Sequence, residues 1–308
     1  MENPTDLCEG GEYFASRLLE VTDFSRKWAR IALARKLPIH LRRILLLSDA
    51  GRCRNKFIYS RKDIYMLLDA TKTVRDFAIE NPSATRVFEK LKIDYCCGGN
   101  QPLTDACGEK GLDLNEVLHL LEEAGQARVA PHSQSPNSMP LASLINLIVV
   151  KHHVFTRDEL ERLTGLLEKV CSAHGKNHPE LLEIQSQFRT LRAELEPHMM
   201  KEERVLFPYI TRLELATAGK QAVPFAPFGH VQNPIAVMMR EHDAAGEILR
   251  TIRELSKDFT IPGDACVSYQ TLYNALQELE ADLHQHIHLE NNILFPGSLE
   301  LEQKAAAM

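Results

Sequence analysis

The pattern His, three residues, Glu, three residues, Leu-Phe-Pro occurs twice in this chain, as "HMMKEERVLFP" at 198–208 and "HIHLENNILFP" at 286–296. In each copy the His falls on the apolar stripe of a predicted helix, and the Glu follows one turn later on the same face. An unpartnered buried carboxylate costs several kcal/mol. The pattern therefore requires a helical fold whose core supplies partners for two inward-facing His/Glu pairs.

Residues 139–297 contain four long windows in which apolar residues, Val205 among them, recur at steps of three and four. This periodicity predicts four amphipathic helices. The breakers between them are "HGKNHPE", "AGKQAVPFAPFGHVQNP" and "TIPGD". Mostly short connections favour an antiparallel four-helix bundle. We expect Phe295 and Pro296 to end the last helix, with residues 298–308 as a C-terminal tail.

The other two predicted helices each place one more His on the core stripe. His153 in "VKHHVF" and His242 in "REHDAAGEIL" are 89 residues apart, and His198 and His286 are 88 apart. The steps from His153 to His198 and from His242 to His286 are 45 and 44 residues. These spacings indicate a duplicated helical hairpin with all six groups at one level of the bundle.

Four imidazoles and two carboxylates at one level of a core are typical of a metal site. Two carboxylates can bridge a pair of metals while two histidines cap each metal, which favours a di-iron centre with an open position for a small molecule. The predicted ligands are His153, His198, Glu202, His242, His286 and Glu290. The alternative is a histidine-rich polar core without metal.

Four other histidines receive different interpretations. His284 and His288 lie two residues on either side of His286, so we expect them to face solvent. His152 stays an alternative to His153 on periodicity alone. His174 lies about 31 Å along the helix from His153, which places it at the loop end and argues against it as a ligand.

The chain before the bundle divides into three predicted regions. Residues 1–63 form a basic extension of uncertain structure, either an amphipathic arm or an unpacked segment, and the native start at Met66 stays open. Residues 64–125 read as short helices, with Ser83 and Asp113 as predicted N-caps. Residues 126–138 have the Pro, Ser and Gly content of a linker.

Charge and cysteine content exclude several classes of protein. Residues 1–62 contain 13 Lys and Arg against 7 Asp and Glu, whereas the rest contains 23 against 35, an acidic body that is unsuited to nucleic acid. No apolar run reaches the length of a membrane span, and no secretion signal is recognisable. Seven scattered cysteines favour a reducing compartment, so we expect a cytoplasmic protein that is not integral to a membrane.

The pair Cys96-Cys97 has two interpretations. Adjacent cysteines are often small buried residues, and they do not bind one tetrahedral metal as easily as a C-x-x-C pair. Gly98 and Gly99 favour the second interpretation, an accessible thiol pair on a sharp turn. Cys107 could be a third participant, whereas Cys171 and Cys266 are expected to be structural.

Together, "VVKHH", "EPHMMKEERVLFP", "REHDAAGEIL", "HIHLENNILFP" and "IDYCCGGNQPL" closely resemble the hemerythrin-like di-iron proteins of the repair of iron centres family, the YtfE/ScdA-type iron-sulfur cluster repair proteins. The resemblance covers about residues 66–297. It implies an all-α protein in which a small helical ScdA-like Cys-Cys domain precedes a hemerythrin-like bundle. It also implies two non-haem irons, oxo- and carboxylate-bridged, on the six residues named above, and it counts a His at the position of His174 among the candidate ligands. Glu241, beside His242, is the carboxylate expected to orient a ligand imidazole.

The resemblance further implies a stress-response function. Iron would be donated to, or handled for, iron-sulfur proteins damaged by oxidants or nitric oxide, with Cys96 and Cys97 assisting in redox or in handling iron or nitric oxide. This interpretation favours an iron donor over a turnover enzyme. Reduction of nitric oxide at the di-iron site, and a hemerythrin-type sensor or store of oxygen or nitric oxide, are the alternatives. The sequence leaves the client proteins, the reductant and a homodimer open.

Overall fold

The computed structural model describes residues 72–126 and 136–308. Every regular element within these two ranges is helical, which confirms the predicted all-α class. The predictions for residues 1–63, and for most of the 126–138 linker, fall outside the described residues. Within the described part of the chain, no helix combines the length and apolarity needed to cross a membrane.

The first described segment is a set of four short helices. They are α5 (Val74–Glu80), α6 (Ala84–Leu91), α7 (Leu103–Lys110) and α8 (Leu114–Gln126). Their apolar faces share one core that contains Phe88 and Leu103. Asp113 begins α8 as predicted, since its Oδ1 accepts from the backbone N–H groups of Asn115 and Glu116 at 2.8 and 3.1 Å. Ser83 precedes α6 but its side chain makes no capping bond, because its own backbone is already helical.

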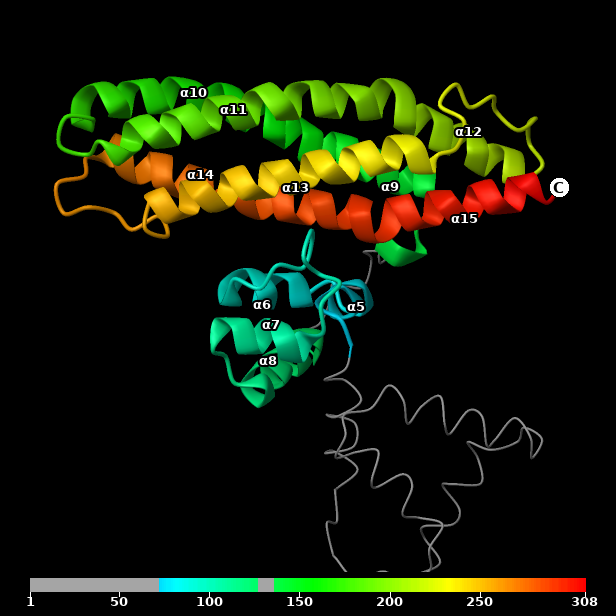
Figure 1. Cartoon of the computed structure of the whole chain (residues 1–308), viewed down its shortest axis with the longest axis horizontal. Helices are drawn as coiled ribbons and strands as arrows, with labels where there is room; N and C mark the ends of the chain where they lie inside the picture. Colours follow the sequence, from blue (N-terminus) through cyan, green and yellow to red (C-terminus); the bar gives the residue numbers. More distant parts are fainter. Residues whose placement is uncertain (1–71, 127–135) are drawn as a thin grey trace, which may run out of the picture. The chain divides into compact units, whose positions relative to one another are not determined.

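The second segment is the predicted bundle of four long rods, which lie side by side in Figure 1. A 3-10 turn, η1 (Pro136–Ser138), precedes it. The first rod is α9 (Leu141–Leu147), η2 (Ile148–His153) and α10 (Val154–His174); the second is α11 (Glu180–Lys201), η3 (Glu202–Leu206) and α12 (Phe207–Thr217); the third is α13 (Gln232–Leu255); the fourth is α14 (Val267–Leu289), η4 (Glu290–Leu294) and α15 (Phe295–Ala306). Helix α11 packs between α10 and α13, and α10 also packs against α14.

Two predictions about the helix ends and faces are wrong for one physical reason. The segments η2, η3 and η4 are π-helical turns, which insert an extra residue into a helix. The fourth rod therefore continues through Pro296 into α15. It can continue because proline is tolerated in the first turn of the α-helix that follows the π turn. Val205 lies within η3 and is 46% exposed, because the wide turn rotates it off the apolar stripe.

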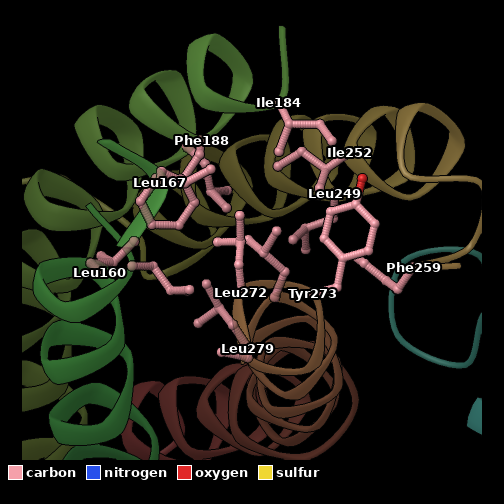
Figure 2. Packing of buried hydrophobic residues seen from close by; sticks show 14 of the residues in the cluster. Leu160, Leu167, Ile184, Phe188, Leu249, Ile252, Phe259, Leu272, Tyr273 and Leu279 are labelled. Carbon is pink, nitrogen blue, oxygen red and sulfur yellow. The ribbon is translucent and has the colours of Figure 1, made fainter. Parts of the chain in front are cut away.

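The core of one half of the bundle is aliphatic and aromatic. Figure 2 shows side chains from all four rods converging there. The labelled residues are Leu160, Leu167, Ile184, Phe188, Leu249, Ile252, Phe259, Leu272, Tyr273 and Leu279. A second apolar cluster, which includes Leu144 and Phe295, fills the other half. The polar level that carries the predicted ligands lies between the two clusters.

Truncating Phe188 tests how much this core stabilises the bundle. Its side chain is 1% exposed, so Phe188→Ala is expected to lower the free energy of unfolding by about 3–5 kcal/mol through lost burial and a cavity. Leu182 on the same helix is 54% exposed, and Leu182→Ala is the matched control with an effect within about 0.5 kcal/mol. Urea unfolding followed by circular dichroism measures both. Equal losses for the two variants would contradict the described packing.

Candidate metal centre

The structure brings together all six predicted ligand side chains, and each is at most 2% exposed. They form two sets of possible ligand atoms that share both carboxylates. One set is His153, Glu202, His286 and Glu290; the other is His198, Glu202, His242 and Glu290. Each set takes side chains from three rods of the bundle, so the site is assembled only when the bundle folds.

The first set, which we call position A, lies between the first and fourth rods. His153 Nε2 lies 3.1 Å from His286 Nε2, and the same His286 atom lies 3.0 Å from Glu290 Oε1. Glu202 Oε2 completes the set at 3.5 Å from His153 Nε2. At these separations, the nitrogen and oxygen lone pairs of the four side chains point toward one common position.

The second set, position B, lies between the second and third rods. His198 Nε2 lies 3.0 Å from His242 Nε2. Glu290 presents its other oxygen here, with Oε2 at 3.1 Å from His242 Nε2, and Glu202 Oε2 lies 3.4 Å from His198 Nε2. Both glutamates therefore face both positions, so each is a candidate to bridge two cations.

The repeated sequence explains how the glutamates come to point inward. Pro208 and Pro296 have no backbone N–H, so the carbonyl four residues earlier loses its helical donor. A π turn lies just before each proline, and in it the N–H of Phe207 bonds to the carbonyl of Glu202 and the N–H of Phe295 bonds to that of Glu290. Each bridging Glu thus begins a wide turn, and π turns recur at functional sites.

Three of the four imidazoles are held from outside through Nδ1. His153 Nδ1 donates to Glu203 at 2.6 Å, His198 Nδ1 donates to Glu241 at 2.8 Å, and His242 Nδ1 donates to Asn291 at 2.9 Å. Glu241 thus orients an imidazole as expected, although the ring belongs to His198 and not to its neighbour in sequence. Such contacts fix the ring so that Nε2 faces the centre. Glu203 and Asn291 were missed, although each follows a bridging Glu.

The buried carboxylates lack the partners that a metal-free core would need. Neither oxygen of Glu202 has a hydrogen-bond partner among the described residues, and Glu290 Oε2 has none either. Leaving such groups unpaired costs several kcal/mol, which a divalent cation at each position would recover. Mixed imidazole and carboxylate donors suit iron, manganese or zinc. The residues present therefore fit the implied iron, and a metal-free polar core does not explain them.

Electrostatics of the site favour neutral imidazoles. Burial and the neighbouring His242 lower the pKa of His198 to about 4, and burial also lowers the pKa of His286. Burial, followed by the charge of Glu290, raises the pKa of Glu202 well above its usual range. Burial opposes ionisation of Glu290, but the facing imidazole of His286 holds its pKa well below the usual range. To hold a cation here, Glu202 would have to lose its proton, whereas the imidazoles would already be neutral and able to coordinate.

The remaining histidines divide differently from the prediction. His174 ends α10, as expected, with Nε2 at 3.2 Å from Cys266 Sγ. His284 is half-buried. His288, predicted to face solvent, is 5% exposed because the ring of Tyr95 packs against it at 5.4 Å and Asn292 Nδ2 lies 2.8 Å from its Nδ1. A second layer thus covers a face of α14 that a four-helix pattern leaves exposed.

The Cys96-Cys97 pair lies on a turn organised by Asp94. One oxygen of this carboxylate accepts from the backbone N–H of both cysteines, at 2.9 and 3.0 Å, and from the Cys96 thiol at 3.3 Å. A side chain at Gly99 would collide with the Tyr95 carbonyl at 2.7 Å, so glycine is required there. The sulfurs lie 3.9 Å apart. The contact with Cys97, together with burial, raises the pKa of Cys96, which therefore stays a thiol.

Cys266, expected to be structural, is exposed at the N-cap of α14 and is predicted to react fastest of the described cysteines with iodoacetamide. The backbone N–H of Tyr269 and then the His174 side chain lower its pKa, so more thiolate is present at neutral pH. His174→Gln should slow alkylation about two- to five-fold and move the midpoint of its pH profile upward. Peptide mass spectrometry measures each site. Faster labelling of Cys171 would contradict this prediction.

Comparisons with known proteins agree with this geometry. Residues 145–297 match the Hemerythrin HHE cation binding domain, and residues 70–125 match ScdA_N, a domain of unknown function. A Haemophilus influenzae protein named "Probable iron-sulfur cluster repair protein" is 36% identical over 230 residues, which cover 75% of this chain and 97% of that protein. "Iron-sulfur cluster repair protein YtfE" of Escherichia coli O81 is 38% identical over 226 residues, covering 73% of this chain and 94% of the relative. The protein of that name from Escherichia fergusonii is 37% identical over the same length.

Proposed function

This chain belongs to the family of iron-sulfur cluster repair proteins that join an ScdA_N domain to a hemerythrin domain, and on that premise we propose that it repairs damaged clusters by donating iron from its bundle. The hemerythrin domain and the buried His/Glu groups indicate an iron-binding protein. Two irons per chain, at positions A and B, are part of the proposal.

The observation that carries the proposal is the pair of buried ligand sets that share Glu202 and Glu290. Each position offers only two imidazoles and two shared carboxylates, which leaves coordination space for an incoming group from a client. Because Glu202 and Glu290 each face both positions, either carboxylate would still have a cation to hold if the other cation were lost. The arrangement therefore supports exchange of iron better than permanent storage.

Release of an iron must leave a stable protein behind. Burial raises the pKa of Glu202, so this carboxylate would take up a proton if a cation left the site. The imidazoles stay neutral because burial lowers the pKa of His198 and His286. The empty position then contains one fewer buried charge, which lowers the cost of giving up the iron.

The thiol turn is the proposed second participant. Cys97 is half-buried, and its sulfur lies 3.9 Å from the point where a side chain at Gly246 would begin. Gly246 follows His242 by one helical turn.

We place the chain in the cytoplasm, since the described cysteines are all free and a reducing compartment keeps them so. Its partners are then iron-sulfur proteins damaged by nitric oxide or oxidants.

The test uses an iron-sulfur enzyme whose cluster has been damaged by nitric oxide. Addition of the iron-loaded protein with a thiol reductant should restore enzyme activity in step with loss of iron from the protein. The control is iron-free protein with an equal concentration of free ferrous ion. No difference from this control would contradict iron donation. Nitrous oxide formed beyond one equivalent per centre would instead favour nitric oxide reduction, and gas binding that only changes partner affinity would favour a sensor.

A further inference from the structure

The internal duplication allows the two halves of the metal centre to be compared residue by residue. His153 corresponds to His242 at a separation of 89, and His198, Glu202 and Glu203 correspond to His286, Glu290 and Asn291 at a separation of 88. The residue after each bridging Glu performs the same task in both halves. Glu203 holds His153 and Asn291 holds His242, each through Nδ1.

The correspondence fails at one pair of positions. Glu241, which precedes His242, holds His198 at 2.8 Å. The equivalent residue is His152, which precedes His153 and should hold His286. Instead, the His152 ring stacks on the His286 ring, with centroids 5.9 Å apart and planes at 13°, and its Nδ1 lies 2.9 Å from Asp282 Oδ1.

His286 is consequently the ligand without an outer hydrogen bond. Its Nδ1 is buried and has no partner among the described residues. Both imidazoles of position B are anchored, whereas position A has one anchored ring and one free ring. Loss of an outer partner typically weakens metal binding about 10- to 100-fold, because the ring orientation and the basicity of the ligand both suffer.

We propose that positions A and B bind iron unequally, and that the iron between His153 and His286 is the exchangeable one that the protein gives up. This inference rests on the proposed binding of iron by the six residues. His152 thus leaves the Nδ1 of His286 without an outer hydrogen bond. A carboxylate at position 152 would accept that bond and make the two halves alike. The iron at position B, held by His198 and His242, would keep the bundle assembled during donation.

The experiment is release of ferrous ion from the loaded protein to excess ferrozine, followed by absorbance. The wild type should release its iron in two phases of equal amplitude, separated about ten-fold or more in rate. His286→Gln should abolish the fast phase and retain the slow one. His242→Gln should leave only fast release. A single phase in the wild type, or a fast phase that survives His286→Gln, would overturn the inference.

Exchanging the unequal residues provides a test that does not remove a ligand. His152→Glu combined with Asp282→Asn, which prevents two carboxylates from facing each other, should slow the fast phase about ten-fold. Asp282→Asn alone is the control and should leave both phases in place. Glu241→His should accelerate the slow phase by a similar factor. Unchanged release in both exchanges, with native circular dichroism, would contradict the assignment.

These results are separable from the proposed function. A wild-type protein that binds no iron would refute the proposed function itself. Two irons that leave at one rate would refute only the inequality. Repair activity with equal release rates would preserve the donor function and remove the distinction between the positions.

Discussion

Replacing both bridging carboxylates, Glu202→Leu with Glu290→Leu, is expected to lower iron content about ten-fold or more and to abolish repair. The same double variant should be more stable than the wild type when both are metal-free, by roughly 1–4 kcal/mol, because leucine replaces two buried carboxylates whose oxygens, Glu290 Oε1 excepted, lack hydrogen-bond partners among the described residues. Metal analysis and thermal unfolding measure the two effects. A double variant that binds less iron but is more stable without metal would indicate that the two carboxylates serve to bind a cation.

Glu280 lies in α14, the helix that leads into Glu290, and it is the matched control for the double variant. It is 4% exposed and paired with Arg253 at 2.6 and 2.9 Å, away from the six ligands. Glu280→Leu should keep the iron and lose about 1–3 kcal/mol of stability. Undiminished repair by the Glu202/Glu290 variant, or loss of iron from the Glu280 variant, would contradict the account.

Replacing both thiols, Cys96→Ala with Cys97→Ala, is expected to slow repair at least about ten-fold, equivalent to ~1.4 kcal/mol of barrier, without changing iron content. The reason is that the bundle holds the iron and the thiol turn assists its transfer. Repair kinetics and metal analysis on the same samples separate the two functions. Cys171→Ala, which alters a cysteine of α10 outside the turn, is the control.

The single variants separate the contributions of Cys96 and Cys97 to the repair rate. Cys97 is the more accessible sulfur, whereas Cys96 is buried and donates to Asp94 at 3.3 Å. Cys97→Ala should therefore account for most of the lost rate. Full repair by the double variant would show that the pair is structural, and the thiol part of the proposal would fail.

The bundle and the convergence of its six candidate ligands could be predicted because helical phase is a local property. A His three residues after one apolar residue and seven after another must face the core, whatever the tertiary details. The near-equality of the two hairpin spacings, 45 and 44 residues, then placed all six groups at one level. His288 shows the limit of this reasoning, since its burial depends on Tyr95, nearly two hundred residues earlier in the chain.

Features that depend on contacts between elements were missed. The outer partners Glu203 and Asn291 lie on wide turns whose rotation no regular helical phase describes. Their signal was their shared place after the bridging Glu. Cys266 was read as a helical residue, although it stands at the N-cap, where the His174 ring lies against its sulfur. Boundary positions of this kind require the neighbouring loop to be known.

The most direct test of the central claim is the metal content of the purified chain, combined with optical and magnetic spectroscopy. The shared carboxylates predict about two irons per chain with the magnetic coupling of a bridged pair. Glu202→Leu should remove that coupling. One uncoupled iron per chain, or zinc in place of iron, would contradict a bridged di-iron centre and with it the proposed donation of iron.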